Sequence, residues 1–168
     1  YLFDQATVTK AKEHWNLKFV QITLDGTEAV YNRTKAYVYK TGSAYQVVLD
    51  NIGRLLNAGI PVVVRMNMEM RNSQDLQALA DELALRFQGK SGLRAYVHLL
   101  FSEGTPWYEQ HTDAEWLWLH DQLYSLEDKL IASGLANGKA VQLPRKLKLN
   151  HCMADCGHAL VVVPDGRL

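Results

Sequence analysis

Three short apolar stretches, separated by amphipathic helical patterns, constrain the fold of this chain more than any other feature. The stretches "LKFVQITL" (17–24), "IPVVVRMNM" (60–68) and "LRAYVHLLF" (93–101) are typical of buried strands. Nearly continuous apolar strands that alternate with helices indicate a parallel sheet, because the connecting helices cover such strands. Three strands are too few to close a barrel, so we expect an open sheet or one half of a (β/α) barrel.

Helical patterns fill most of the sequence between and after these strands. Ser43 and Ser73 are predicted N-caps, and Thr112 to Glu115 has the spacing of a capping box. The helices are predicted from about Gln5 to His14, from Ser43 to Ala58-Gly59, from Ser73 to Gly89, and from Thr112 to about Ile131. The second has an apolar face of Val47, Val48, Ile52, Leu55 and Leu56. The segment between Gly26 and Ser43 is predicted to be a loop.

Composition excludes several function classes. Eighteen basic residues balance eighteen acidic ones, so bulk charge predicts neither nucleic-acid nor membrane-surface binding. No apolar run approaches the roughly 20 residues needed to cross a bilayer. Two cysteines are too few for a disulfide scaffold, and no signal segment is visible, so we expect a reducing, cytoplasmic setting.

Polar side chains inside the three apolar strands are candidates for function. Ligands of parallel α/β proteins bind at the carboxyl ends of the strands. The candidates there are Gln21, Thr23, Arg65, Asn67, Tyr96 and His98. A buried guanidinium needs an anion, so Arg65 suggests a carboxylate or phosphate ligand. The alternative is that Arg65 lies near an edge or pairs with a neighbouring acidic residue, and that Gln21, Thr23 and His98 are satisfied core residues.

Both cysteines of the chain lie in "HCMADCGHALVVVPDGRL" at its end, and this segment has three interpretations. Cys152 and Cys156 could bind zinc together with His151 and His158, although C-x3-C differs from the usual knuckle spacing. They could be buried thiols without a ligand. One could also belong to an iron–sulfur cluster whose other ligands lie beyond Leu168. Spacing alone does not choose between these.

Several linked motifs resemble the radical S-adenosylmethionine (SAM) enzymes. The stretch "VQITLDGTEAVYNRTKAYVYKTGSAYQVVLDNIGRLLNAGIPVVVRMNM" is similar to the second half of their barrel core. It contains a strand ending in Leu-Asp-Gly, a Tyr-Asn-x-x-Lys segment, a helix with Leu-Asp-Asn-Ile, and a strand with a cation followed by Asn. The segment "HCMADCGHALVVVPDGRL" resembles the opening of the SPASM extension, in which a cysteine precedes a strand and a Pro-Asp-Gly turn. Together these cover roughly residues 15–101 and 150–168.

The resemblance implies a fold, a set of site residues and cofactors. Residues 1–134 would be the C-terminal half of the barrel, an α/β partial barrel of three parallel strands with outer helices and then a long helix. Residues 135–168 would be a linker and the truncated, hairpin-like start of the SPASM domain. Thr23, Arg65 and Asn67 would bind SAM, Arg65 through the SAM carboxylate, and Cys152 would bind an auxiliary [4Fe–4S] cluster. Cys156 has no counterpart in the pattern, and no catalytic acid or base is assigned.

The C-x3-C-x2-C motif that holds the family's SAM-cleaving [4Fe–4S] cluster is absent. The chain begins with Tyr1, and both ends look cut, so we expect a fragment that is inactive alone. The parent would generate a 5′-deoxyadenosyl radical to modify a peptide or protein. Open sheet edges in such a fragment predict edge-to-edge association of copies. The alternative is a non-enzymatic α/β binding module with a small zinc site near its end.

Overall fold

The computed structural model describes residues 3–35, 42–100 and 111–137. The chain divides into two compact units, Tyr1–Gly138 and Lys139–Leu168, and all described residues belong to the first unit. The predicted linker and SPASM segment, 135–168, therefore lies almost wholly outside the described residues, as does the cysteine segment.

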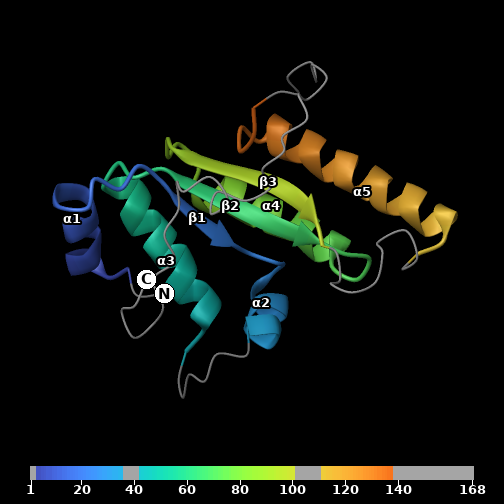
Figure 1. Ribbon diagram of the computed structural model, residues 1–168, viewed down its shortest axis with the longest axis horizontal. Coiled ribbons are helices and arrows are strands. Elements are labelled where there is room, and N and C mark those ends of the chain that lie inside the picture. The colour runs from blue at the N-terminus through green and yellow to red at the C-terminus, as the bar shows by residue number, and fades with distance from the viewer. Residues whose placement is uncertain (1–2, 36–41, 101–110, 138–168) are drawn as a thin grey trace, which may run out of the picture. The chain divides into compact units, whose positions relative to one another are not determined.

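The described part is α/β, with a three-stranded parallel sheet in the order β1-β2-β3 and five helices (Figure 1). The elements in chain order are α1 (Gln5–Glu13), β1 (Val20–Thr23), α2 (Glu28–Lys35), α3 (Ala44–Asn57), β2 (Val62–Met68), α4 (Ser73–Arg86), β3 (Leu93–Leu99) and α5 (Asp113–Ala132). The predicted alternation and the parallel pairing are confirmed. The arrangement is consistent with part of a (β/α) fold.

Burial alternates along β2 and divides the sheet into two faces. Val62, Val64, Met66 and Met68 are fully buried, whereas the intervening Val63, Arg65 and Asn67 are only half-buried. Successive side chains of a strand point to opposite faces, so the buried set marks one apolar face. Helices α3 and α4 contact β2, and α5 contacts β3 and α4, and all three contribute to the same core. These helices therefore cover the apolar face.

The helix starts were predicted with mixed success. Ser43 accepts a hydrogen bond from the main-chain N–H of Gln46, and Thr112 and Glu115 form the predicted capping box. The prediction that Ser73 caps α4 is wrong, because Ser73 is the first helical residue and Asn72 is the N-cap. The Asn72 side chain does not cap the helix, since it bonds to the strand ends instead.

Three further predictions need correction. The segment after Gly26 is not simply a loop, since it contains α2, a helix of low apolar content that periodicity did not reveal. The first strand is shorter than 17–24, because Asn16 takes a positive φ and the chain turns there before pairing begins at Val20. Val47 is 37% exposed and does not belong to the apolar face of α3, whose buried residues include Tyr45 and Leu49 instead.

Helix α5 separates its two tryptophans as its spacing predicts. Trp116 packs against the core, whereas Trp118 is 40% exposed, because residues two apart lie on different sides of a helix.

No helix among the described residues combines the length and apolar character needed to span a membrane.

Candidate functional site

The face of the sheet opposite the helices carries most of the polar residues that the sequence singles out. This polar face consists of Gln21 and Thr23 from β1, Arg65 and Asn67 from β2, and Arg94, Tyr96 and His98 from β3. All seven side chains are half-buried or exposed. Because strands buried on both faces carry apolar side chains throughout, this composition indicates a surface that meets a ligand or water.

Parallel register brings the predicted cofactor residues together. Thr23 is the register partner of Arg65, and Arg65 is the register partner of Tyr96. These three form one row across the sheet, with neighbouring strands about 4.8 Å apart. Asn67 and His98 form the next row, about 7 Å further toward the carboxyl ends of the strands. The structure therefore places Thr23, Arg65 and Asn67 on one face at adjacent positions.

Arg65 lies at the centre of the polar face with an unsatisfied donor. Its Nε atom is buried, and it has no hydrogen-bond partner in the described part of the chain. Leaving a buried charged donor unpaired costs about 1–3 kcal/mol or more. The two alternatives for Arg65 do not fit the described residues. Its strand, β2, is central in the sheet and not at an edge, and the ion pairs among these residues involve other basic side chains. An acceptor on a bound ligand would satisfy this donor.

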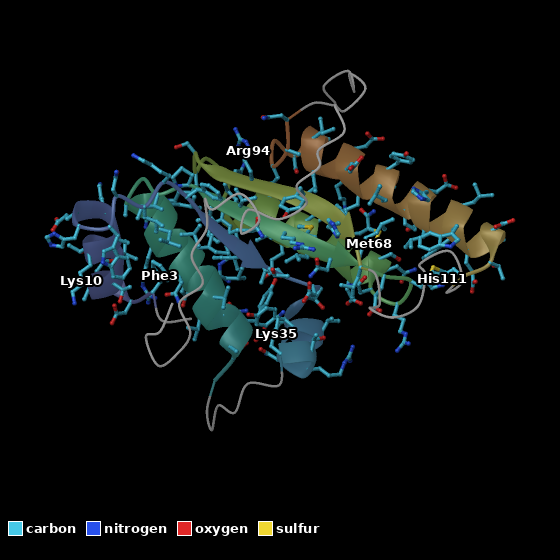
Figure 2. All side chains as sticks on the ribbon, in the orientation of Figure 1. Phe3, Lys10, Lys35, Met68, Arg94 and His111 are labelled. Carbon is cyan, nitrogen blue, oxygen red and sulfur yellow. The ribbon has the colours of Figure 1, made fainter. Side chains whose placement is uncertain are left out.

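Tyr96, in the same row as Arg65, and Arg94, one row nearer the strand starts, have hydrogen-bond partners within the protein. The Tyr96 hydroxyl donates to Gln21 Oε1 at 3.3 Å, across β2. The Arg94 guanidinium donates to the main-chain oxygen of Leu93 at 2.8 Å. Figure 2 shows Arg94 at the start of β3 and Met68 at the end of β2, at opposite ends of the sheet. The buried atoms of this face without a partner among the described residues are Arg65 Nε, in the middle row, and Asn67 Oδ1, in the row at the strand ends, where parallel α/β proteins bind ligands.

A cleft of about 350 Å³ opens at the carboxyl ends of β1 and β2. We call it the strand-end cleft. Its polar lining includes Asp25, Arg33, Asn67, Glu69, Arg71, Asn72 and Asp75. Two buried acceptors of this lining, Asp25 Oδ1 and Asn67 Oδ1, have no hydrogen-bond partner in the described part. Among the sequence candidates only Asn67 borders this cleft.

Asn72 organises the strand-end cleft, and the sequence analysis missed it. Its Nδ2 donates to the main-chain oxygens of Asp25 and Asn67, both at 2.9 Å, and its Oδ1 accepts from the N–H of Glu69 at 2.9 Å. One buried amide therefore joins the end of β1 to the end of β2 and to the following turn. The one available signal was an Asn next to a helix start, which is more often an N-cap.

The Asp25 side chain, which follows β1, is held by helix α2. Lys35 of α2 lies 3.1 Å from Asp25 Oδ2, and the Lys35 ammonium is 5.9 Å from the ring centroid of Tyr31. Figure 2 shows Lys35 at the end of α2. Helix α2, which the sequence analysis missed, thus fixes one carboxylate oxygen, Oδ2, while Oδ1 is buried and has no partner among the described residues.

Thr23 borders a second, separate hollow. This edge groove has a volume of about 340 Å³ and runs along the outer edge of β1, over Val48 and Leu55 of α3. Val20 and Leu24 donate their N–H groups to β2, so the main-chain groups of Gln21 and Thr23 point away from it, toward the outer edge. The edge is free among the described residues, but self-association of the chain remains a prediction.

The largest pKa shift belongs to a residue outside the polar face. Burial, followed by the hydrogen bond that the Tyr45 hydroxyl donates to Glu82 at 2.7 Å, raises the pKa of Tyr45 well above its ordinary value. A phenol held neutral between α3 and α4 stabilises the fold and does not face either hollow. Tyr45 is therefore a structural residue.

The predicted metal site falls outside the described residues. His151, Cys152, Cys156 and His158 all lie there, so neither the iron–sulfur nor the zinc interpretation is tested. Among residues 3–35, 42–100 and 111–137, no three His, Cys, Asp or Glu side chains come together as metal ligands.

Comparison with known proteins adds no relative: no protein-family model, no curated protein and no solved structure matches this chain. The geometry of the polar face and the strand-end cleft is therefore the basis on which function is argued.

Proposed function

We propose that this chain is the C-terminal part of a radical SAM barrel followed by the start of a SPASM domain, and that Thr23, Arg65 and Asn67 of its polar face bind SAM. The single observation that carries the proposal is Arg65 Nε, a buried cationic donor without an acceptor in the described part. A carboxylate is the ligand group that best satisfies such a donor, because charge-assisted hydrogen bonds are the strongest in proteins.

The chain's own residues would bind and orient the ligand. Arg65 would hold the carboxylate, and the Thr23 hydroxyl, its register partner, can donate to the same group. Asn67 would border the ligand on the side of the strand ends. In the parent enzyme these residues would hold SAM, whose one-electron reductive cleavage by a [4Fe–4S] cluster would give methionine and a 5′-deoxyadenosyl radical able to remove a hydrogen atom from a peptide or protein substrate. Iron–sulfur clusters would be held by cysteines outside this chain and, for an auxiliary cluster, by Cys152.

The binding part of the proposal is tested with S-adenosylhomocysteine, an unreactive ligand with the same carboxylate. We expect it to bind to the 168-residue chain, as measured by calorimetry or by NMR titration. The Arg65→Gln variant should bind it about 10- to 100-fold more weakly, as a charged hydrogen bond contributes roughly 1.5–3 kcal/mol. The matched control is Arg94→Gln, on the same face but bonded to Leu93, which should bind normally.

Two results would contradict the binding part. One is no binding of S-adenosylhomocysteine to the chain, and the other is equal binding by the Arg65→Gln variant. 5′-Methylthioadenosine, which lacks the amino-acid part, serves as a ligand control and should not distinguish the two proteins. The cluster part is tested by anaerobic reconstitution of the parent polypeptide with iron and sulfide, where Cys152→Ala should remove one [4Fe–4S] cluster. Uptake of one zinc ion and no iron would favour the binding-module alternative instead.

A further inference from the structure

We call the half-buried residues with acceptor groups in the strand-end cleft, namely Asp25, Asn67 and Asp75, its floor. Asp25, Asn67 and Asp75 are half-buried in its lining, whereas Arg33 and Arg71 are exposed at its margin. The Asp75 carboxylate accepts from the Thr27 hydroxyl at 3.1 Å, which leaves its charge unbalanced by that contact. Charges that are partly buried act more strongly on a ligand than exposed ones, because water screens them less.

Two of these residues, Asp25 and Asn67, each carry a buried acceptor that lacks a donor. Asp25 Oδ1 and Asn67 Oδ1 are both buried, and neither has a hydrogen-bond partner within the described ranges. The Asn72 amide bonds to the main-chain oxygens of both residues, which holds the two residues next to each other. Asp25 uses its other oxygen for Lys35. A ligand that fits here must therefore bring donors, and at least two of them.

The chemistry of the floor favours a primary ammonium group. An ammonium carries three N–H donors and a positive charge, which matches two unsatisfied oxygens together with the nearby Asp75 carboxylate. A carboxylate or phosphate would meet acceptors instead of donors at this position. Arg65 lies one row further from the strand ends, and its unsatisfied donor requires an acceptor from a ligand.

We propose that the strand-end cleft binds a primary ammonium group of the substrate, either a lysine side chain or an amino terminus, through Asp25 Oδ1 and Asn67 Oδ1. Calling this ligand the substrate rests on the proposed function, whereas amine binding itself does not. The order of the two sites follows from the sheet, since Arg65 precedes Asn67 along β2. The substrate would thus enter from the strand ends, above a ligand held at Arg65.

The test is an NMR titration of the 168-residue chain with small amines. The probes are Nα-acetyl-lysine N-methylamide, which has only the side-chain ammonium, and alaninamide, which has only the α-ammonium. Nα-acetyl-norleucine N-methylamide, which has no ammonium, is the ligand control. We expect at least one amine to bind and to shift the side-chain amide signals of Asn67 and Asn72, and the preferred amine identifies the source of the ammonium.

Two variants keep the test specific. Asp25→Asn removes the charge with little change in shape, and Asn67→Ala removes the second acceptor, and each should weaken amine binding at least 10-fold. Asp121→Asn, on the exposed surface of α5, is the matched control and should bind normally. Equal binding of the norleucine compound, unchanged binding by both cleft variants, or preferential binding of Mg²⁺ over both amines would overturn the proposal.

S-Adenosylhomocysteine carries a primary ammonium as well as a carboxylate, so the two proposals are separated with its N-acetyl derivative, which keeps the carboxylate and has no ammonium. Asp25→Asn should retain binding of the N-acetyl derivative while it loses amine binding, and Arg65→Gln should show the reverse. Amine binding without Arg65-dependent binding of S-adenosylhomocysteine or its N-acetyl derivative would support the cleft proposal and contradict the proposed function. Arg65-dependent binding of these two ligands without amine binding would support the proposed function and contradict the cleft proposal.

Discussion

Replacing Asn72 by alanine should destabilise the protein and open the strand-end cleft. The substitution removes three hydrogen bonds of 2.9 Å, from Nδ2 to the main-chain oxygens of Asp25 and Asn67, and to Oδ1 from the N–H of Glu69. Each such bond contributes about 0.5–1.5 kcal/mol net to stability. Asn72 is 7% exposed, so water replaces these bonds poorly.

The expected loss is about 2–3 kcal/mol in the free energy of unfolding. Three average bonds sum to about 3 kcal/mol, and partial rehydration of the main-chain groups through the cleft lowers that figure. Urea denaturation followed by circular dichroism and tryptophan fluorescence measures the change, with the denaturant slope as a check on two-state behaviour. Asn57→Ala is the matched control, because its Oδ1 accepts a single exposed hydrogen bond from Lys90.

Asn57→Ala should change stability by less than about 0.5 kcal/mol, as exposed substitutions usually do. If Asn72→Ala is as stable as Asn57→Ala, the amide does not join the strand ends and the argument for the cleft geometry fails. Asn72→Asp is informative as well, because it keeps the acceptor for Glu69 but loses both donors. We expect it to be at least as unstable as the alanine variant.

Three further predictions concern the scaffold. Thr112→Ala removes the capping box of α5 and should lower the free energy of unfolding by about 0.5–2 kcal/mol, as measured by urea denaturation. An unchanged denaturation midpoint would show that the cap does not stabilise the protein. Tyr45→Phe should lose about 1–2 kcal/mol near neutral pH. Because folding raises the pKa of Tyr45, its contribution is complete below the ordinary pKa of 10.0 and decreases above it. Stability curves of wild type and Tyr45→Phe should therefore converge above pH 10.0, and a constant difference would contradict this. Gly26→Ala should reduce the melting temperature, since φ is 152° and the added Cβ would lie 2.9 Å from Val30 Cγ1; an unchanged melting temperature would refute the steric argument.

Local patterns predicted the elements whose signals are carried by their own residues. The apolar run around Val64 and Met66 identified β2, and Ser43 and Thr112 marked true helix starts. Helix α2 escaped because its residues are mostly polar, and it forms through contacts with α3 and through the Lys35–Asp25 ion pair. Such contacts join segments distant in sequence, so the hydrophobic periodicity of one segment does not predict them.

The sequence alone determined the alternating α/β plan, and polar residues in apolar strands are visible without coordinates. This pattern singled out Gln21, Thr23, Arg65, Asn67, Tyr96 and His98. Tertiary structure decided which face they share, since register sets the rows and the helices cover only the apolar side. It also decided that Asn72 bonds to strand ends 47 and 5 residues away and does not cap its helix. The hydrogen-bond partners of a side chain depend on which groups folding brings within reach. The strand-end cleft therefore depends on tertiary contacts of Asn72 that the sequence does not reveal.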